Sequence, residues 1–176
     1  MRCCDEIKFS RLISFDPNLR LSLWKTPEEA RKRILYGMKQ CDIMKISEEE
    51  VAFVSEQESL EKGVSFIRDN SDIKILFVTL GNKGSIAYYK DEKIYCRGIH
   101  QEHVVDTTGA GDTFCGAVLS RILELGTDAL TEKDIREMLL FANAAASIVV
   151  TRKGALCSMP EPEEIRAASS LIDKVL

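Results

Sequence analysis

Long apolar runs are missing from this 176-residue chain, and so is any excess of positive charge. No hydrophobic segment approaches the roughly 20 residues that a membrane-spanning helix needs. Residues 1–6 also lack the apolar core of a secretory signal peptide, so we expect a cytoplasmic protein without membrane contact. Lys and Arg total 24 against 28 Asp and Glu, whereas a nucleic-acid surface would show a basic stripe. We therefore expect no nucleic-acid partner.

Clustered metal ligands and cysteine motifs are missing as well. The six cysteines include no Cys-x-x-Cys pair and lie at positions 3, 4, 41, 96, 115 and 157. Without a secretory signal we expect them to be reduced thiols, and Cys115 to be a small core residue. The histidines form one pair, His100 and His103, with no further ligand at a spacing typical of a metal site. Structural zinc is therefore not expected.

Strand-like and helix-like segments alternate along the chain. The expected strands are 12–15, 43–46, 73–80, 85–89 and 93–96, the first of them short and buried and the last two forming a hairpin. The expected helices start near Thr26 and Ser47, pass through 60–67, and cover about 111–125, 132–150 and 161–174. Hydrophobic residues make up 45% of the chain, enough for one well-buried domain, and no linker or repeat is visible. This order predicts one α/β domain over residues 1–176, a sheet with helices on both sides.

The most informative segment is VDTTGAGDTFCG, residues 105–116. It places small residues, Gly109 to Gly111, at the expected junction between a strand and a buried helix. Small residues let a bound group approach the main chain, and the N–H groups and dipole of a helix start favour negative charge. Asp112 stands beside that position and could remove a proton there, which points to phosphoryl transfer onto a hydroxyl. The alternative is that Asp112 only complements the helix dipole, worth some tenths of a kcal/mol up to about 1.

Two commoner glycine motifs do not fit this segment. A dinucleotide-binding fingerprint requires glycine where Phe114 stands. A Walker-type phosphate loop requires Lys and Ser or Thr after Gly116, where Ala117 and Val118 stand.

Polar motifs follow the other expected strands too. They are Asp16, Lys45–Glu50, Thr79–Gly84 and Asp106–Asp112. In open α/β sheets, ligands bind at the carboxyl ends of the strands. We therefore expect these motifs to converge on one site at that edge.

Residues 106–117, DTTGAGDTFCGA, resemble the C-terminal signature of the ribokinase-like (PfkB-type) carbohydrate kinases. Further matches occur in family order at 16–20 (DPNLR), 45–50 (KISEEE), 79–84 (TLGNKG), 143–146 (NAAA) and 151–155 (TRKGA). Within the family, the DPNLR and KISEEE runs are most similar to fructokinases. The resemblance implies a three-layer α/β/α ribokinase-like fold, with a mostly parallel sheet flanked by helices. It further implies that this chain is the C-terminal, ATP-binding and catalytic portion, without the N-terminal sugar-binding and lid portion.

The resemblance also implies a reaction, the ATP-dependent phosphorylation of a sugar hydroxyl, with fructose converted to fructose 6-phosphate. Its cofactors would be ATP, Mg²⁺ and K⁺. Asp112 would be the general base, and the anion hole would be the backbone amides of Gly109, Ala110, Gly111 and Asp112. Glu50 would hold Mg²⁺ through water, and the residues near the nucleotide would be Ser47, Thr79, Gly81, Gly84 and Asn143. Those corresponding to a K⁺ site are Asp106, Thr108, Val149, Arg152, Gly154 and Ser158.

Several of these roles have a structural alternative. Glu50 can be half of a helix capping box, and Asp106 can form an Asx turn at a helix entry. The glycines of residues 79–84 can serve a strand-to-hairpin turn. Asn143 can be a surface residue or a polar group that packs a helix.

Two functions remain open at this stage. One is a fructokinase-like enzyme, and the other is a catalytically silent remnant or one half of a split kinase that binds nucleotide or a partner. A sheet cut in two leaves an exposed edge or apolar patch. Besides the sugar, the expected partners are therefore a second copy of the chain or the missing N-terminal half. The sequence leaves the identity of the sugar open.

Overall fold

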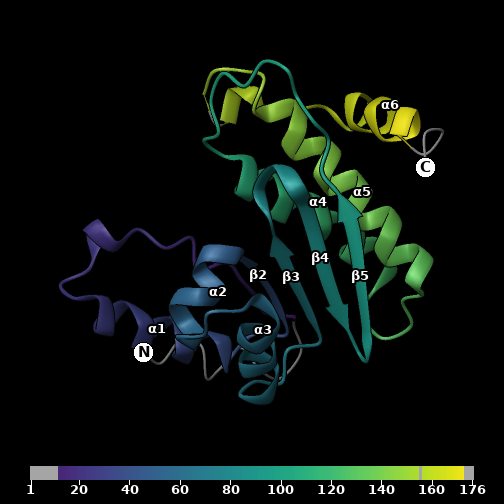
Figure 1. The fold of residues 1–176 in the computed structure, drawn as a ribbon. Coiled ribbons are helices and arrows are strands. Elements are labelled where there is room, and N and C mark those ends of the chain that lie inside the picture. The colour runs from purple at the N-terminus through teal and green to yellow at the C-terminus, as the bar shows by residue number, and fades with distance from the viewer. Residues whose placement is uncertain (1–11, 155, 173–176) are drawn as a thin grey trace. The chain divides into compact units, whose positions relative to one another are not determined.

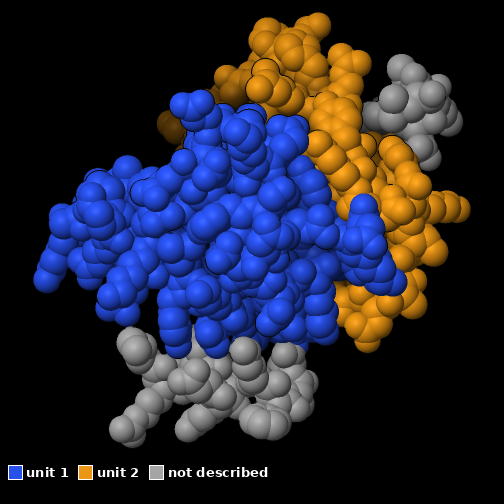
Figure 2. All heavy atoms as spheres, turned by 60° about the horizontal axis from the view of Figure 1, so that its bottom comes forward, with its two compact units in different colours: residues 1–79, 88–91 blue, residues 80–87, 92–176 orange. Residues whose placement is uncertain are grey.

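The computed structural model describes residues 12–154 and 156–172. The chain divides into two compact units, coloured separately in Figure 2. Unit 1 contains residues 1–79 and 88–91, and unit 2 contains residues 80–87 and 92–176.

The strands form a mixed sheet with helices beside it, which confirms the α/β class (Figure 1). They are β1 (Ser14–Phe15), β2 (Ile43–Ser47), β3 (Ile75–Thr79), β4 (Gly84–Tyr89) and β5 (Glu92–Arg97), paired in that order. In unit 1, β1, β2 and β3 are parallel, with Ser14 opposite Ile43 and Met44 opposite Leu76. The first four residues of β2 and of β3 are buried, as strands covered on both faces should be.

The helices of unit 1 begin where their capping residues predict. Helix α1 (Pro27–Met38) follows Thr26, whose hydroxyl accepts a hydrogen bond from the Glu29 N–H at 3.2 Å. Helix α2 (Glu48–Ser55) begins with the expected capping box between Ser47 and Glu50. Helix α3 (Leu60–Asp69) packs against α2. Ala30, Ile34 and Met38 of α1 are buried, which anchors the helix in the core of this unit.

Unit 2 is built on three helices: α4 (Ala110–Leu125), α5 (Glu132–Val149) and α6 (Pro162–Ile172). Helix α5 starts with a capping box between Thr131 and Asp134 and packs against α4, β5 and α6 (Figure 1). In the part of the chain that the structure describes, no helix is both long and apolar enough to cross a bilayer.

Three expectations about local structure were wrong. The first strand is shorter than expected and poorly buried, because Ser14 is exposed and Phe15 only half-buried; β1 has a single neighbour in the strand order. Residues 98–109 contain no strand before α4, because the Val105 and Asp106 amides both donate to the Val150 carbonyl at the end of α5 (2.8 and 3.3 Å). Cys115 is half-buried and is not a core residue.

Candidate active site

The signature segment forms the N-terminus of α4. Gly109 caps the helix with φ +82°, a left-handed conformation that glycine adopts without strain. Helical hydrogen bonding begins with the Thr113 amide donating to the Gly109 carbonyl at 2.8 Å, and the Ala110 amide donates to the Thr107 carbonyl at 3.3 Å. The first amides of a helix have no partner within it, and the peptide dipoles add positive potential there. Asp112 lies in this first turn and is exposed, so it is not turned into the protein interior.

Asp106 links the approach to α4 with the segment that follows α5. One of its carboxylate oxygens accepts from the Thr108 amide at 2.9 Å, the geometry of an Asx turn, and the other accepts from the Gly154 amide at 3.4 Å. Hydrogen bonding from Thr108 lowers the pKa of Asp106, with a smaller contribution from Gly154. The Asx-turn alternative is therefore realised, and it keeps a carboxylate beside the residues predicted to hold a monovalent cation.

Most of the residues predicted for that cation site are joined by hydrogen bonds within unit 2. The Ser158 hydroxyl donates to the Gly154 carbonyl, and Arg152 donates to the Ser158 carbonyl at 3.4 Å. Arg152 also forms an ion pair with Glu164 at the start of α6. Val149 is the last residue of α5 and is fully buried. The cluster offers carboxylate and carbonyl oxygens, the ligand type that hard cations prefer.

The segment predicted to lie along the nucleotide is a tight turn. Thr79 ends β3, Gly81–Lys83 forms a single turn of 3₁₀-helix, and the Leu80 amide donates to the Gly84 carbonyl at 2.8 Å. Gly84 has φ +113°, and a Cβ there would lie 2.1 Å from the Cys96 carbonyl oxygen. Gly81 has φ +59° with open space around it. Of these two positions, close packing requires glycine only at position 84. At position 81, glycine is favoured because the backbone is left-handed.

Asn143 is buried in the middle of α5, with 7% of its surface exposed. Its side chain bonds to Ser85 and to the backbone of β5. Of the two structural alternatives, the helix-packing one describes this geometry.

Unit 1 has a cavity of about 640 Å³ beside the N-terminus of α2. Its lining residues are Asn18, Leu19, Arg20, Leu21, Ser22, Lys45, Ser47, Glu49, Glu50 and Phe53. Glu50, which is buried, accepts from the Ser47 amide at 2.8 Å with one oxygen and from the Leu19 amide at 2.6 Å with the other. It is therefore both the helix cap and the anchor of the DPNLR loop.

Asp16 and Lys45 make a second anchor for this loop. The Lys45 ammonium lies 3.3 Å from each oxygen of Asp16, and both side chains are largely shielded from solvent. Burial raises the pKa of Asp16, whereas Lys45 opposes that rise. Both residues were expected at this edge of the sheet, but neither was given a role. The parallel register could have indicated their pairing, because Phe15 pairs with Met44 and the next residues along each strand are Asp16 and Lys45.

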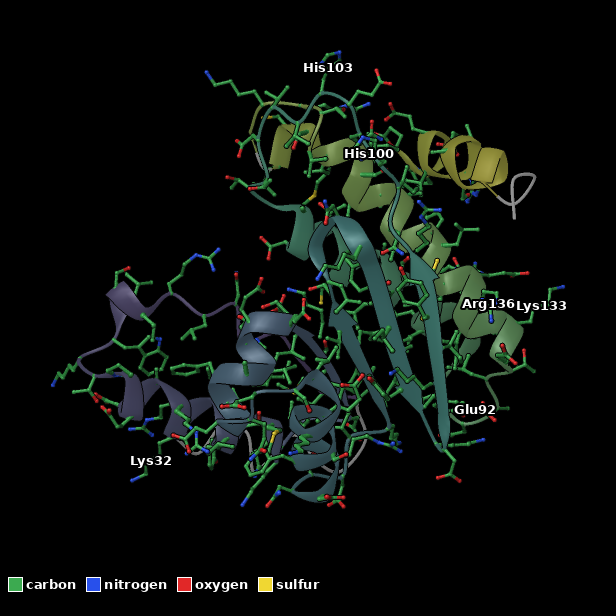
Figure 3. All side chains as sticks on the ribbon, viewed as in Figure 1. Lys32, Glu92, His100, His103, Lys133 and Arg136 are labelled. Atoms are coloured by element: carbon green, nitrogen blue, oxygen red, sulfur yellow. The ribbon has the colours of Figure 1, made fainter. Side chains whose placement is uncertain are left out.

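Neither histidine belongs to a metal site in the structure. His100 and His103 are exposed on the segment between β5 and α4 (Figure 3). Across residues 12–154 and 156–172, no three His, Cys, Asp or Glu side chains cluster as metal ligands. The four cysteines in these ranges are free thiols.

Comparison with known proteins identifies the class to which this architecture belongs, the sugar kinases of ribokinase-like fold. The model of the pfkB family carbohydrate kinases matches residues 1–162. The chain therefore belongs to the pfkB carbohydrate kinase family. It is 41% identical over 157 residues to fructokinase-1 of Oryza sativa subsp. japonica, covering 88% of this chain and 47% of that one. It is 38% identical over 153 residues to fructokinase-2 of Solanum lycopersicum, covering 87% and 46%.

Solved structures agree with this assignment. A fructokinase double mutant of Vibrio cholerae, with fructose, ADP and potassium bound, matches with a TM-score of 0.80 and 33% identity, over 89% of this chain and 49% of that one. An E. coli protein assigned as ribokinase II, in complex with ATP and Mg²⁺, matches with a TM-score of 0.75 and 31% identity, over 91% and 49%. The ribokinase-like fold is thereby confirmed. The chain spans about half the length of the relatives that it matches.

Proposed function

We propose that this chain is the nucleotide-binding and catalytic portion of an ATP-dependent sugar kinase that converts fructose to fructose 6-phosphate. The observation that carries the proposal is the N-terminus of α4, where Asp112 is exposed in the first helical turn after a left-handed glycine cap. A carboxylate there can accept a proton next to main-chain N–H groups that favour negative charge. The two fructokinases and the bound fructose and ADP of the Vibrio protein support the choice of reaction.

In the proposed reaction, Asp112 takes the proton of the sugar hydroxyl while the hydroxyl oxygen bonds to the γ-phosphorus of ATP. The bond from that phosphorus to the bridging oxygen breaks, and ADP leaves. The amides of Gly109, Ala110, Gly111 and Asp112 would stabilise the charge that develops in the transition state, and for this the Ala110 amide has to leave the Thr107 carbonyl, from which it lies 3.3 Å in the structure. Removal of one such donor typically costs about 2.7–4 kcal/mol of barrier, so the helix start contributes as much as the base.

Glu50 is the proposed Mg²⁺ carboxylate. An ionised carboxylate has about four lone-pair positions. Two of those on Glu50 accept the Ser47 and Leu19 amides, which leaves two for metal-bound water. Mg²⁺ commonly keeps several waters and uses few protein carboxylates, so this donor set fits the ion. When bound, Mg²⁺ neutralises charge on the phosphates.

Nucleotide roles are proposed for residues of each unit, and K⁺ roles for residues of unit 2. The 80–84 turn would lie along ATP, and so would Thr79 at the end of β3. Ser47, a residue of unit 1, would form a hydrogen bond near the phosphates of ATP. The cation would be held by Asp106, Thr108, Val149, Arg152, Gly154 and Ser158, several of them through carbonyl oxygens. The hydrogen bonds among Asp106, Gly154 and Ser158 support this grouping.

A second candidate function is a chain that binds nucleotide and acts only with a partner, either a separate N-terminal portion or a second copy of itself. The exposed Leu21 and Leu23 of unit 1 offer apolar surface for such a partner.

One experiment separates these functions. The purified chain is titrated with MgATP by calorimetry and then assayed for ADP release with fructose, glucose or ribose, with and without K⁺. The kinase proposal expects MgATP binding and ADP release that depends on fructose. Binding without turnover supports the second function, and absence of MgATP binding contradicts both.

A further inference from the structure

A buried carboxamide links α5 to the turn assigned to the nucleotide. We propose that Asn143 is a positioning residue, which fixes the 80–84 turn through the backbone of β5 and does not itself contact the adenine base. The function of that turn rests on the proposed kinase activity, whereas the positioning itself does not.

The surroundings of Asn143 show that it belongs to a tightly packed layer. Its neighbours Ala142, Ala144 and Ala145 are fully buried, and α5 packs against β5 (Figure 1). Small side chains allow the helix to approach the strands closely. Asn143 itself is 7% exposed, and Ser85, which meets it from β4, is 0% exposed.

The hydrogen bonds of Asn143 use both of its donors. The Nδ2 group donates to the Cys96 carbonyl at 3.2 Å and to the Arg97 carbonyl at 3.3 Å. The Ser85 hydroxyl donates to Oδ1 at 3.0 Å. Backbone carbonyls can only accept, so the nitrogen must face β5, and this settles which way the amide points. A carboxamide has two N–H donors, so none remains to donate to a ring nitrogen of adenine.

The carbonyls that Asn143 holds belong to the segment against which the turn packs. The Gly98 amide, next in the chain, donates to the Lys83 carbonyl at 3.0 Å, and the Tyr95 hydroxyl donates to that carbonyl at 2.7 Å. A Cβ on Gly84 would lie 2.1 Å from the Cys96 oxygen. A shift of the Cys96 carbonyl would therefore move the turn.

Removal of the carboxamide would take one hydrogen-bond partner from each of three groups. They are the hydroxyl of Ser85 and the carbonyls of Cys96 and Arg97, and the loss of a hydrogen bond at a buried residue is costly. Asn143→Asp would be worse than Asn143→Ala, because it places a carboxylate against carbonyl oxygens. Ser85→Ala removes only one of the three hydrogen bonds, at a residue too buried to touch a base.

The test uses the full chain with Asn143→Ala, Asn143→Asp and Ser85→Ala. Asn70→Ala is the control, because this exposed asparagine at the end of α3 in unit 1 makes only one side-chain hydrogen bond to the backbone, to the Phe66 carbonyl of its own helix. Three quantities are measured: the melting temperature, amide hydrogen exchange at Gly98, and the Kd for ATP and for GTP. Because ATP and GTP differ at the base edge, their Kd ratio reports on base contact.

Positioning predicts a lower melting temperature and faster Gly98 exchange in all three variants, with Asn143→Asp most affected. Asn70→Ala should leave Gly98 exchange unchanged, because its one hydrogen bond lies within α3. It also predicts that the Kd for ATP and for GTP rise by the same factor. A tenfold change in the ATP-to-GTP ratio in Asn143→Ala, with stability and exchange unchanged, overturns the proposal. If Asn143→Ala does not fold, Ser85→Ala decides, and unchanged melting and exchange in that variant count against the proposal. If no nucleotide binds, the proposed function fails, while melting and exchange still decide the positioning.

Discussion

Glu50 shows how one side chain can serve both folding and chemistry. The sequence allowed two roles for Glu50, half of a helix capping box or the metal ligand that the family resemblance implies. The structure realises the capping box and adds a third contact, the Leu19 amide 31 residues away. No local pattern predicts that contact, because it depends on how the DPNLR loop returns to α2.

Glu50→Gln is expected to weaken both folding and Mg²⁺ binding. The amide nitrogen of Gln would face either the Leu19 or the Ser47 N–H, which leaves a buried donor unsatisfied at a cost of about 1–3 kcal/mol. Urea unfolding and Mg²⁺-dependent ATP binding would show both losses. Glu49→Gln, on the same helix turn but outside the capping box, is the control. Full stability in Glu50→Gln would mean that these two hydrogen bonds contribute nothing.

Among the secondary-structure elements, those with local signals were predicted well. Capping residues located the starts of α1 and α2, and short apolar runs located β2 and β3. The segment 98–109 was predicted wrongly as ending in a strand. Val104 and Val105 look strand-like, yet both are exposed, and the Val105 amide bonds to Val150. A pairing partner 45 residues away is not encoded in local periodicity.

Gly84→Ala should destabilise the chain by about 1–3 kcal/mol, because it forces a left-handed residue and overlaps the Cys96 oxygen. Gly116→Ala is the matched control, since a Cβ in that part of α4 meets nothing within 4 Å. A helix-interior alanine is expected to stabilise by about 0.5–1 kcal/mol. Thermal melting of both variants checks this. Equal effects at the two positions would mean that the turn is not constrained by β5.

The Asp16–Lys45 pair should matter far more than a surface pair. Lys45→Met leaves the Asp16 carboxylate shielded and unpaired, at an expected cost of about 3–5 kcal/mol. Lys133 and Glu137 form an exposed ion pair on α5. Lys133→Met removes this pair and should lower the free energy of unfolding by less than about 1 kcal/mol. Adding Asp16→Asn to Lys45→Met should recover part of the loss. Urea unfolding gives all three values, and a double variant no better than the single one would contradict the pairing.

At the scale of the whole molecule, the pH dependence of folding follows from several shifted carboxyl groups. Hydrogen bonds lower the pKa of Asp106, Asp134 and Glu164, chiefly from Thr108, Thr131 and Arg152. A lowered folded-state pKa stabilises the fold above the unfolded value, and that stability is lost as pH falls through the folded value. The free energy of unfolding should therefore fall as the pH is lowered below about 4, the ordinary carboxyl range. Asp16, whose pKa is raised, acts in the opposite direction.

Urea unfolding between pH 6 and pH 3 would test this acid dependence. Asp134→Asn removes one of the three groups and should flatten the slope, whereas a slope unchanged in that variant would contradict the assignment. Cys41 makes the free energy of unfolding depend on pH at high pH as well, because burial raises its thiol pKa to about 12. The unfolded thiol ionises first, so stability should fall as pH rises from about 9 towards that value.

Family and fold could be predicted from the sequence because the motifs keep their order along the chain. The family match over residues 1–162 confirms the family, and the similar solved structures confirm the fold. The site roles remain predictions. They depend on how Asp112 acts on a bound sugar, and that depends on groups beyond the motif itself.

Comparison of the wild-type chain with Asp112→Asn is the most direct measurement of the central claim. Both proteins are titrated with MgATP and assayed for fructose 6-phosphate, with Asp91→Asn in the exposed β4–β5 turn as the control. We predict that wild type and Asp91→Asn form product, and that Asp112→Asn binds MgATP with nearly unchanged affinity but transfers nothing measurable. Product formation by Asp112→Asn at the wild-type rate would contradict the account.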